Sequence, residues 1–173
     1  MTDYDEYETP PALVNLLLNK VFNKLEEPRK LTYLDPCTGS GNWFTELNRR
    51  NLEVHYCEIL EGLDFYKVSD TYDIIVGNPP FSQTSKWLMH TAKTAKLMIG
   101  YILPAHGLSY RRLSLMEDFG WKLTAIHSFD NPKAWNLGFA HFFCIWEKTE
   151  NQDLGTEPIG RAKGVQRMLG DFI

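Results

Sequence analysis

The sequence is short of several features that define other classes of protein. It has three cysteines, Cys37, Cys57 and Cys144, with no CxxC pair, so we expect reduced thiols rather than disulfides. No set of histidines and acidic residues has the spacing of a metal site, so we expect no metal. Aliphatic runs such as 97–103 are far shorter than the roughly 18 to 20 apolar residues of a membrane span. Because the N-terminus is acidic rather than signal-like, we expect a soluble, cytoplasmic protein.

Basic charge is also scarce. The formal net charge of -4 argues against a protein that binds any polyanion, because phosphate contacts need clustered lysine and arginine. Local basic clusters do occur, and they lie at Arg49-Arg50, at Arg111-Arg112, and at Arg161, Lys163 and Arg167. For binding nucleic acid, a local patch of positive charge matters more than the net charge of the whole chain. Nucleic acid is therefore not excluded as a partner, although solvated helix faces explain each cluster equally well.

The length and composition indicate one compact domain. A chain of 173 residues with 43% hydrophobic content can bury roughly two thirds of its unfolded surface. The polar segment 149–158 is typical of a linker. We therefore expect one catalytic domain over 1–148, followed by a linker and a short C-terminal tail over 149–173.

Hydrophobic patterning predicts an alternation of strands and helices. After Thr9-Pro10-Pro11, apolar residues recur at helical spacing from Leu13 through Leu16 and Leu17 to Val21. Apolar runs then predict strands at 31–34, 54–57, 73–77 and 97–103, separated by predicted helices at 42–50 and 83–96. Two further strands, 122–128 and 139–148, have no helix between them and predict an antiparallel pair at one edge. The fold class is therefore α/β, with a mostly parallel sheet, an antiparallel edge strand and helices on both faces.

The first informative segment runs from Leu34 to Asn42 and joins a strand to a glycine turn. Asp35 ends the strand, and Gly39 and Gly41 allow positive φ and a close approach of a ligand to the backbone. The segment has neither a complete GxGxxG fingerprint nor a GK[ST] phosphate loop, which disfavours a nucleoside triphosphate. An ordinary strand-to-helix turn is the alternative.

Two acidic residues follow the second strand. Glu58 stands where α/β folds place a carboxylate that accepts both hydroxyls of a ribose. Asp64 can accept from an adenine amino group while Phe65 packs against the adenine ring. A solvent-facing strand end and an exposed turn are the alternatives.

The most specific segment is the strand end Asn78-Pro79-Pro80-Phe81. The Asn78 amide oxygen and the Pro79 carbonyl can together accept both hydrogens of a target amino group, and the prolines lack competing N–H donors. Phe81 offers a stacking face for a planar base or amide. A structural double-proline turn is the alternative.

These segments resemble motifs of class I S-adenosylmethionine-dependent methyltransferases, which have a Rossmann-like sheet. The run from Asp35 and Pro36 to Gly39 and Gly41 is similar to their motif I, and Asn78 to Phe81 is similar to motif IV of the amino-methylating branch. The closest likeness is to DNA adenine-N6 methyltransferases of the gamma motif order, and it extends over residues 9–148. Thr9-Pro10-Pro11 resembles motif X, and 102–104 and 139–143 resemble motifs VI and VIII.

The resemblance implies S-adenosyl-L-methionine as cofactor and DNA adenine as target. The cofactor residues that it implies are Thr9, Pro10, Asp35, Pro36, Gly39, Gly41, Glu58, Asp64, Phe65 and Asn78. The catalytic residues that it implies are Asn78, Pro79, Pro80 and Phe81. The expected reaction is direct methyl transfer to a flipped-out or unpaired adenine, without a covalent enzyme intermediate.

The sequence departs from the family in one respect, and other functions stay open. About 25 residues follow Lys148, whereas gamma-type enzymes usually carry a large target-recognition domain. Specificity would then come from a partner subunit or a homodimer, or be low. RNA adenine or protein glutamine are alternative targets, although glutamine methyltransferases often have Tyr at the position of Phe81. A non-catalytic binding protein and a nucleotide-dependent oxidoreductase are further alternatives. His106 and His141 can contact substrate, but core or surface histidines are more common.

Overall fold

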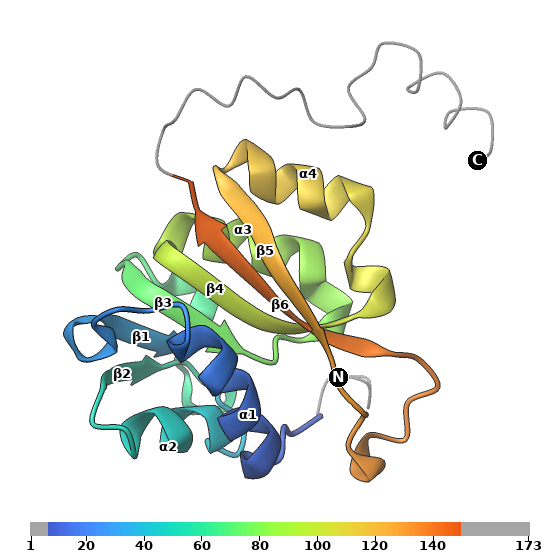
Figure 1. Cartoon of the computed structure of the whole chain (residues 1–173), viewed down its shortest axis with the longest axis horizontal. Helices are drawn as coiled ribbons and strands as arrows, with labels where there is room; N and C mark the ends of the chain where they lie inside the picture. The colour runs from blue at the N-terminus through green and yellow to red at the C-terminus, as the bar shows by residue number, and fades with distance from the viewer. Residues whose placement is uncertain (1–6, 150–173) are drawn as a thin grey trace.

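The computed structural model describes residues 7–149, which form one six-stranded sheet with helices on both faces (Figure 1). The sheet order is β2-β1-β3-β4-β6-β5. In chain order the strands are β1 (Thr32–Asp35), β2 (Glu53–Tyr56), β3 (Tyr72–Gly77), β4 (Ala95–Pro104), β5 (Trp121–Ser128) and β6 (His141–Lys148). Each predicted strand is present, with bounds within two residues of those expected.

One strand runs against the others. The pairs β2-β1, β1-β3 and β3-β4 are parallel, whereas β6 is antiparallel to both of its neighbours, β4 and β5. The predicted antiparallel edge pair is therefore confirmed, with β5 at the edge and β6 one place in. Because Pro104 of β4 and Ser128 of β5 lie opposite the first residues of β6, β6 begins at the edge of the sheet where the parallel strands end.

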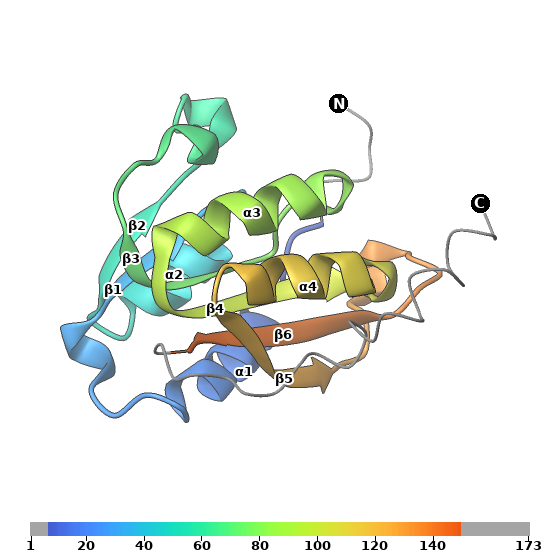
Figure 2. The same ribbon diagram turned by 90° about the horizontal axis from the view of Figure 1, so that it is seen from above.

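The helices divide between the two faces. α1 (Pro11–Phe22) and α2 (Asn42–Asn48) contact each other and share one hydrophobic cluster, whereas α3 (Thr84–Thr94) and α4 (Tyr110–Asp118) share the cluster on the opposite face. Figure 2 shows α3 and α4 side by side above the sheet and α1 below it. The doubly covered sheet explains why β3 and β4 are almost continuously apolar.

The structure selects one face of α1 for burial. The residues buried are Val14, Leu17, Leu18 and Val21, at i, i+3, i+4 and i+7. Leu16, which also stands at helical spacing in the sequence, is 61% exposed. The long apolar run of this helix supports two overlapping stripes, and packing against the sheet selects the one that includes Val14.

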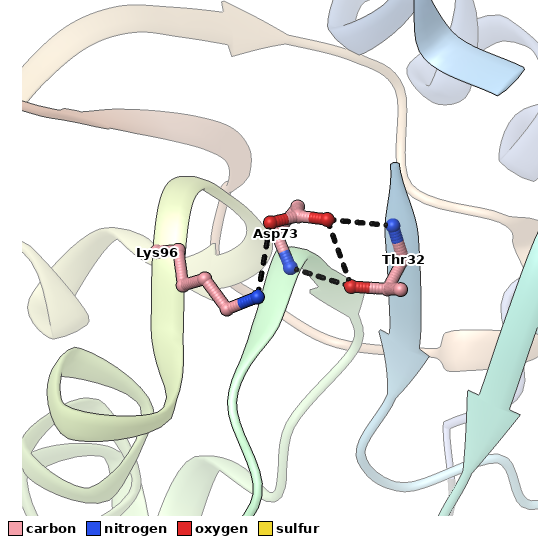
Figure 3. A network of polar contacts seen from close by, with 3 residues as sticks. All are labelled: Thr32, Asp73 and Lys96. Atoms are coloured by element: carbon pink, nitrogen blue, oxygen red, sulfur yellow. Dashed lines mark hydrogen bonds and ion pairs between the residues drawn. The ribbon is translucent and has the colours of Figure 1, made fainter. Parts of the chain in front are cut away.

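A polar network joins three strands at their amino-terminal ends (Figure 3). The Asp73 carboxylate accepts hydrogen bonds from the backbone N–H and the hydroxyl of Thr32, at 2.8 and 2.9 Å. Lys96 Nζ lies 3.2 Å from the other carboxylate oxygen. These donors hold the pKa of Asp73 below its ordinary value, although partial burial opposes them. The network fixes β1, β3 and β4 at the edge opposite the candidate site.

Part of the sequence lies outside the described residues. The proposed linker and tail begin at Thr149, whose N–H donates to the Gly120 carbonyl, and the basic residues Arg161, Lys163 and Arg167 fall beyond it. Among the helices of residues 7–149, none has the length and apolar character needed to cross a bilayer.

Candidate active site

The ends of β1 and β3 meet at the carboxyl edge of the sheet. A Cβ placed on Gly77 would lie 3.4 Å from Asp35 Oδ1 and from Pro36 Cδ, so the two strand ends lie close together. Cys37 Sγ donates to the Asn78 carbonyl at 3.3 Å. Burial raises the pKa of the Cys37 thiol, which keeps it protonated as this donor. The glycine turn after β1 and the Asn78 segment after β3 therefore lie next to each other.

The glycine turn after β1 has the conformation that the sequence predicts. Gly39 and Gly41 have φ of 50° and 83°, in the region that disfavours side chains. Asp35 is fully buried beneath the turn, where its carboxylate accepts from the backbone N–H of Phe44 at 3.1 Å and of Cys37 at 3.4 Å. Asp35 therefore ties the turn to the first residues of α2.

Burial gives Asp35 an unusual titration. Its pKa is raised to about 7, mainly because desolvation disfavours the carboxylate, although its hydrogen bonds act in the opposite direction. Glu58 adds a smaller repulsive contribution. The carboxyl group therefore changes charge near neutral pH unless a cation binds close to it.

Glu58 connects the turn to the end of β2. Its carboxylate accepts from Gly39 N–H at 2.8 Å and from Leu60 N–H at 3.0 Å. Each oxygen thus accepts one described bond and keeps further acceptor capacity. The side chain is partly exposed, so a ligand lying on the glycine turn can reach it.

Asp64 and Phe65, which were predicted to bind adenine together, face different surroundings in the structure. Asp64 is partly exposed and lines a groove of about 470 Å³ beside β2, together with Tyr56, Cys57 and Leu63. Phe65 instead packs in the core against Trp87 and His90, with ring centroids 4.8 and 4.6 Å away, and is 3% exposed. The expectation that the Phe65 ring packs against adenine is corrected, because its neighbours already cover that ring.

The orientation of the Asn78 amide follows from its partners. Asn78 Nδ2 donates to the Tyr7 carbonyl at 2.6 Å, and since a carbonyl cannot donate, the amide nitrogen must face Tyr7. The amide oxygen then points away from Tyr7. It is buried and has no hydrogen-bond partner among the described residues. A buried acceptor without a donor is costly, so this atom is a candidate ligand-binding group.

Aromatic rings surround the residues that follow Asn78. Pro79 is buried, and Pro80 precedes a short 3-10 turn, Phe81–Gln83. The Phe81 ring is stacked with that of Tyr7, with centroids 6.1 Å apart and an interplanar angle of 15°. It also contacts His141 at 5.0 Å. The predicted stacking residue therefore lies in an aromatic cluster beside the unpaired Asn78 oxygen.

The N-terminal segment and the β5-β6 loop complete this cluster. Thr9 was predicted as a cofactor residue and the loop as a segment that can hold substrate, whereas Tyr7 was not predicted. Trp135 Nε1 donates to the Glu8 carbonyl at 2.8 Å, and its ring lies 6.2 Å from that of Tyr7. Asn42 Nδ2 donates to the Thr9 carbonyl at 3.0 Å, while the buried Thr9 hydroxyl has no partner among the described residues. These contacts tie residues 7–9 to α2 and to the β5-β6 loop, and Figure 1 shows the segment before α1 next to that loop.

The Arg111-Arg112 pair lies at the first turn of α4, after the carboxyl end of β4. Arg112 donates to Ser85 Oγ at 2.9 Å and to the His106 carbonyl at 2.8 Å, whereas Arg111 is exposed. Arg50 bonds to Asn15 and Asn19 of α1 and is structural. Within the described part of the chain, no group of three histidine, cysteine or acidic side chains is arranged to hold a metal ion.

Sequence comparison identifies no relatives: no family model matches the chain, and neither does any curated protein. Solved structures do match. A putative RNA methyltransferase from Pyrococcus horikoshii is 14% identical, with a TM-score of 0.64 over 85% of this chain and 88% of its own. The magnesium protoporphyrin IX methyltransferase of Synechocystis, with bound SAM, is 12% identical, with a TM-score of 0.60 over 80% of this chain and 77% of its own. The chain has a class I methyltransferase fold.

A third match is a type I restriction-modification methyltransferase subunit from Streptococcus thermophilus. It is 16% identical, with a TM-score of 0.60, and the match covers 87% of this chain and 46% of the subunit. The chain spans about half the length of the longer structures that it matches. Since the first two names give different substrates, RNA and magnesium protoporphyrin IX, the fold leaves the substrate of this chain open.

Proposed function

We propose that this protein is an S-adenosylmethionine-dependent methyltransferase that methylates the N6 amino group of adenine in DNA, in an unpaired or flipped-out base. The observation that carries the proposal is the Asn78 amide. Its nitrogen is held by the Tyr7 carbonyl, and its buried oxygen has no donor among the described residues. An amino group placed beside Phe81 supplies the missing N–H donor.

The residues on the cofactor side fit S-adenosylmethionine. Glu58 has acceptor capacity for ribose hydroxyls above a glycine turn that lets a ligand approach the backbone. Asp64 lines a groove with room for a purine and can accept from its amino group. Thr9 offers a buried, unpartnered hydroxyl, and with Pro10 it lies next to α2 through Asn42. Asp35 and Pro36 support the turn, and the Asp35 carboxylate favours a nearby positive charge.

The cofactor supplies the methyl group, and the Asn78 to Phe81 segment orients the amino group that receives it. S-adenosylmethionine supplies, when bound, an electrophilic methyl group on a sulfonium. Asn78 Oδ1 accepts one N–H of the target amino group, and the Pro79 carbonyl is expected to accept the other. These bonds orient the nitrogen lone pair, while Pro80 and Phe81 fix the plane of the target. Catalysis then comes mainly from positioning, without a covalent enzyme intermediate.

Adenine is favoured over an amide by the aromatic surroundings. Phe81 and Tyr7 are partly exposed and form a cluster of rings with Trp135 and His141 next to Asn78, and stacking on an aromatic ring contributes about 1 to 3 kcal/mol per base. DNA rather than RNA rests on the motif resemblance, and the restriction-modification match is consistent with it. We propose a partner subunit or a homodimer as the source of sequence specificity.

The test is a product analysis. The protein is incubated with labelled S-adenosylmethionine and, separately, with plasmid DNA, single-stranded DNA, RNA and cell lysate, and the products are digested and identified. N6-methyladenine in DNA supports the proposal, with single strands the better substrate. Label in N6-methyladenosine of RNA alone, or in protein glutamine alone, would overturn the choice of substrate. Failure of cofactor to bind in a direct titration would overturn the whole assignment.

A further inference from the structure

His141 lies at the same edge of the sheet as Asn78, although it comes from the opposite end of the domain. It is the first residue of β6 and pairs with Pro104, the last residue of β4. Its side chain is 1% exposed, and its ring lies 5.0 to 5.1 Å from the rings of Phe81, Trp135 and Phe139. His141 is therefore part of the aromatic cluster that is proposed to receive the target base.

The protonation of the His141 ring follows from a chain of hydrogen bonds. Asn131 Nδ2 donates to the Phe139 carbonyl at 2.8 Å, which turns Asn131 Oδ1 towards His141. His141 Nδ1 lies 2.9 Å from that oxygen. Because an amide oxygen can only accept, Nδ1 must carry the proton. In the neutral ring the lone pair is then on Nε2.

The Nε2 atom is buried and has no hydrogen-bond partner among the described residues. It is thus a second unpaired buried acceptor, on a ring that contacts Phe81, three residues after Asn78. Burial, and to a smaller extent the nearby His106, lower the pKa of His141, so the resting ring is neutral. If the ring gains a proton, the Nδ1–H bond to Asn131 and the faces of the surrounding aromatic rings stabilise the cation.

Methylation of an amino nitrogen leaves a proton that the Asn78 and Pro79 carbonyls are too weakly basic to take. We propose that His141 Nε2 accepts this proton, directly or through one water, and this inference rests on the proposed function. The nitrogen forms a bond to the methyl carbon while the sulfur–methyl bond breaks and its electron pair goes to sulfur. One N–H proton passes to Nε2, and the imidazolium later releases it to solvent. Asn131 is the positioning residue that keeps Nε2 free.

The first measurement needs no activity. Nitrogen NMR of the free protein at neutral pH should show His141 protonated at Nδ1 and unprotonated at Nε2. In Asn131→Leu the two tautomers should mix, because the acceptor for Nδ1–H is removed. A protonated Nε2 in the free protein would overturn the assignment of His141.

The second measurement is single-turnover methyl transfer to an adenine-containing single-stranded oligonucleotide at saturating cofactor. His141→Phe keeps an aromatic ring but removes the base, and it should lower the rate about a hundredfold or more. Oligonucleotide affinity and the unfolding midpoint should stay close to those of the wild type. His127→Phe, on the neighbouring strand β5, is the matched control and should keep the wild-type rate. An unchanged rate in His141→Phe would overturn the inference and leave methyl transfer intact.

The pH profile separates a base from a purely structural histidine. The wild-type rate should fall as the pH drops through the pKa of His141, and Asn131→Asp should move this fall to higher pH because a carboxylate favours the imidazolium. The other titratable or charged groups on the elements around His141 are Tyr7, Glu8, His106, Asp130 and Lys133. His106→Gln should move the fall only slightly, to higher pH, because His106 makes the smaller contribution to lowering the pKa of His141. A profile that Asn131→Asp does not move would contradict the role. Absence of transfer by the wild type to every substrate tested would instead overturn the proposed function.

Discussion

Asn78 Nδ2 lies 2.6 Å from the carbonyl oxygen of Tyr7, so a residue at the start of the domain sets the orientation of the candidate catalytic amide. Deleting residues 1–7 removes this acceptor and lets the amide rotate. We expect kcat to fall roughly tenfold or more, because a small misplacement of a positioning group is costly. Deleting residues 1–6 keeps Tyr7 and is the control, which should be close to wild type. Equal rates in the two deletions would contradict this role for Tyr7.

Replacing Asn78 tests the catalytic assignment itself. Asn78→Ala removes the unpaired acceptor, and turnover should fall by at least about a hundredfold, as for other preorganised polar groups. Cofactor affinity, measured by calorimetry, should change little because Glu58 and the glycine turn are untouched. Asn48→Ala, at the exposed end of α2, is the matched control. Full activity in Asn78→Ala would remove this residue from the mechanism.

Glu58 should act on cofactor affinity rather than on the methyl-transfer step. Glu58→Gln replaces an acceptor oxygen with a donor next to the N–H of Gly39 or Leu60, and it weakens ribose binding. We expect the Kd for cofactor to rise about tenfold to a hundredfold, since losing a charged hydrogen-bond partner costs about 1.5 to 3 kcal/mol. Glu61→Gln, which affects an exposed bond to Tyr56, should bind normally. Equal affinities would count against the ribose assignment.

Asp35 makes the stability of the free protein depend on pH. Its folded pKa of about 7 lies above the ordinary 3.8, so the native state binds the proton more tightly than the unfolded chain. Its contribution is complete below about pH 4 and is lost as the pH rises through 7, by up to roughly 4 kcal/mol. Urea titrations of wild type and Asp35→Asn should therefore diverge in slope over this range. Parallel pH dependences would exclude a raised pKa.

Cofactor binding should depend on pH in the opposite direction to the stability of the free protein. If the positive sulfonium binds near Asp35, it favours the carboxylate, so cofactor affinity should increase between pH 6 and 8 in the wild type and not in Asp35→Asn. Calorimetry in buffers of different ionisation enthalpy would detect the proton released on binding. No proton release at pH 7 would separate Asp35 from the cofactor.

Gly100 tests the packing of the central sheet. A Cβ there would lie 2.8 Å from Phe143 Cζ and 3.1 Å from Val76 Cγ1, and these neighbours are buried. Gly100→Ala should destabilise the fold by about 1 to 3 kcal/mol through overpacking. Gly138→Ala, with no atom within 4 Å of its Cβ, should change stability by less than about 1 kcal/mol. Similar unfolding free energies for the two variants would contradict the close contact.

The sequence predicts the order of elements well because apolar periodicity and turn residues are local signals. The strand ends at Asp35 and Gly77 are marked by acid, glycine and proline, and the structure brings them together as expected for parallel neighbours. α4 was not predicted, since its amphipathic stripe is short and ends at Met116. The exposure of Leu16 could not be predicted, because periodicity alone does not choose between overlapping apolar stripes.

The candidate site was predicted in part, for a physical reason. Asn78 and Asp35 stand at recognisable strand ends, and their chemistry is visible in the residue types. Tyr7, Trp135 and His141 join the site through contacts between residues far apart in the chain, such as Trp135 with Glu8. Phe65 is the opposite case. It was predicted as a site residue, but its contacts with α3 bury it in the core.

The reversed direction of β6 has a consequence for synthesis. The glycine turn, Glu58 and Asn78 all lie within the first half of the chain, whereas His141 leaves the ribosome among the last residues of the domain. Since folding during synthesis proceeds from the N-terminus, the cofactor side of the site can assemble before the aromatic side exists. A nascent chain could then bind cofactor before it can hold a target, and methyl transfer would begin only after β6 inserts between β4 and β5.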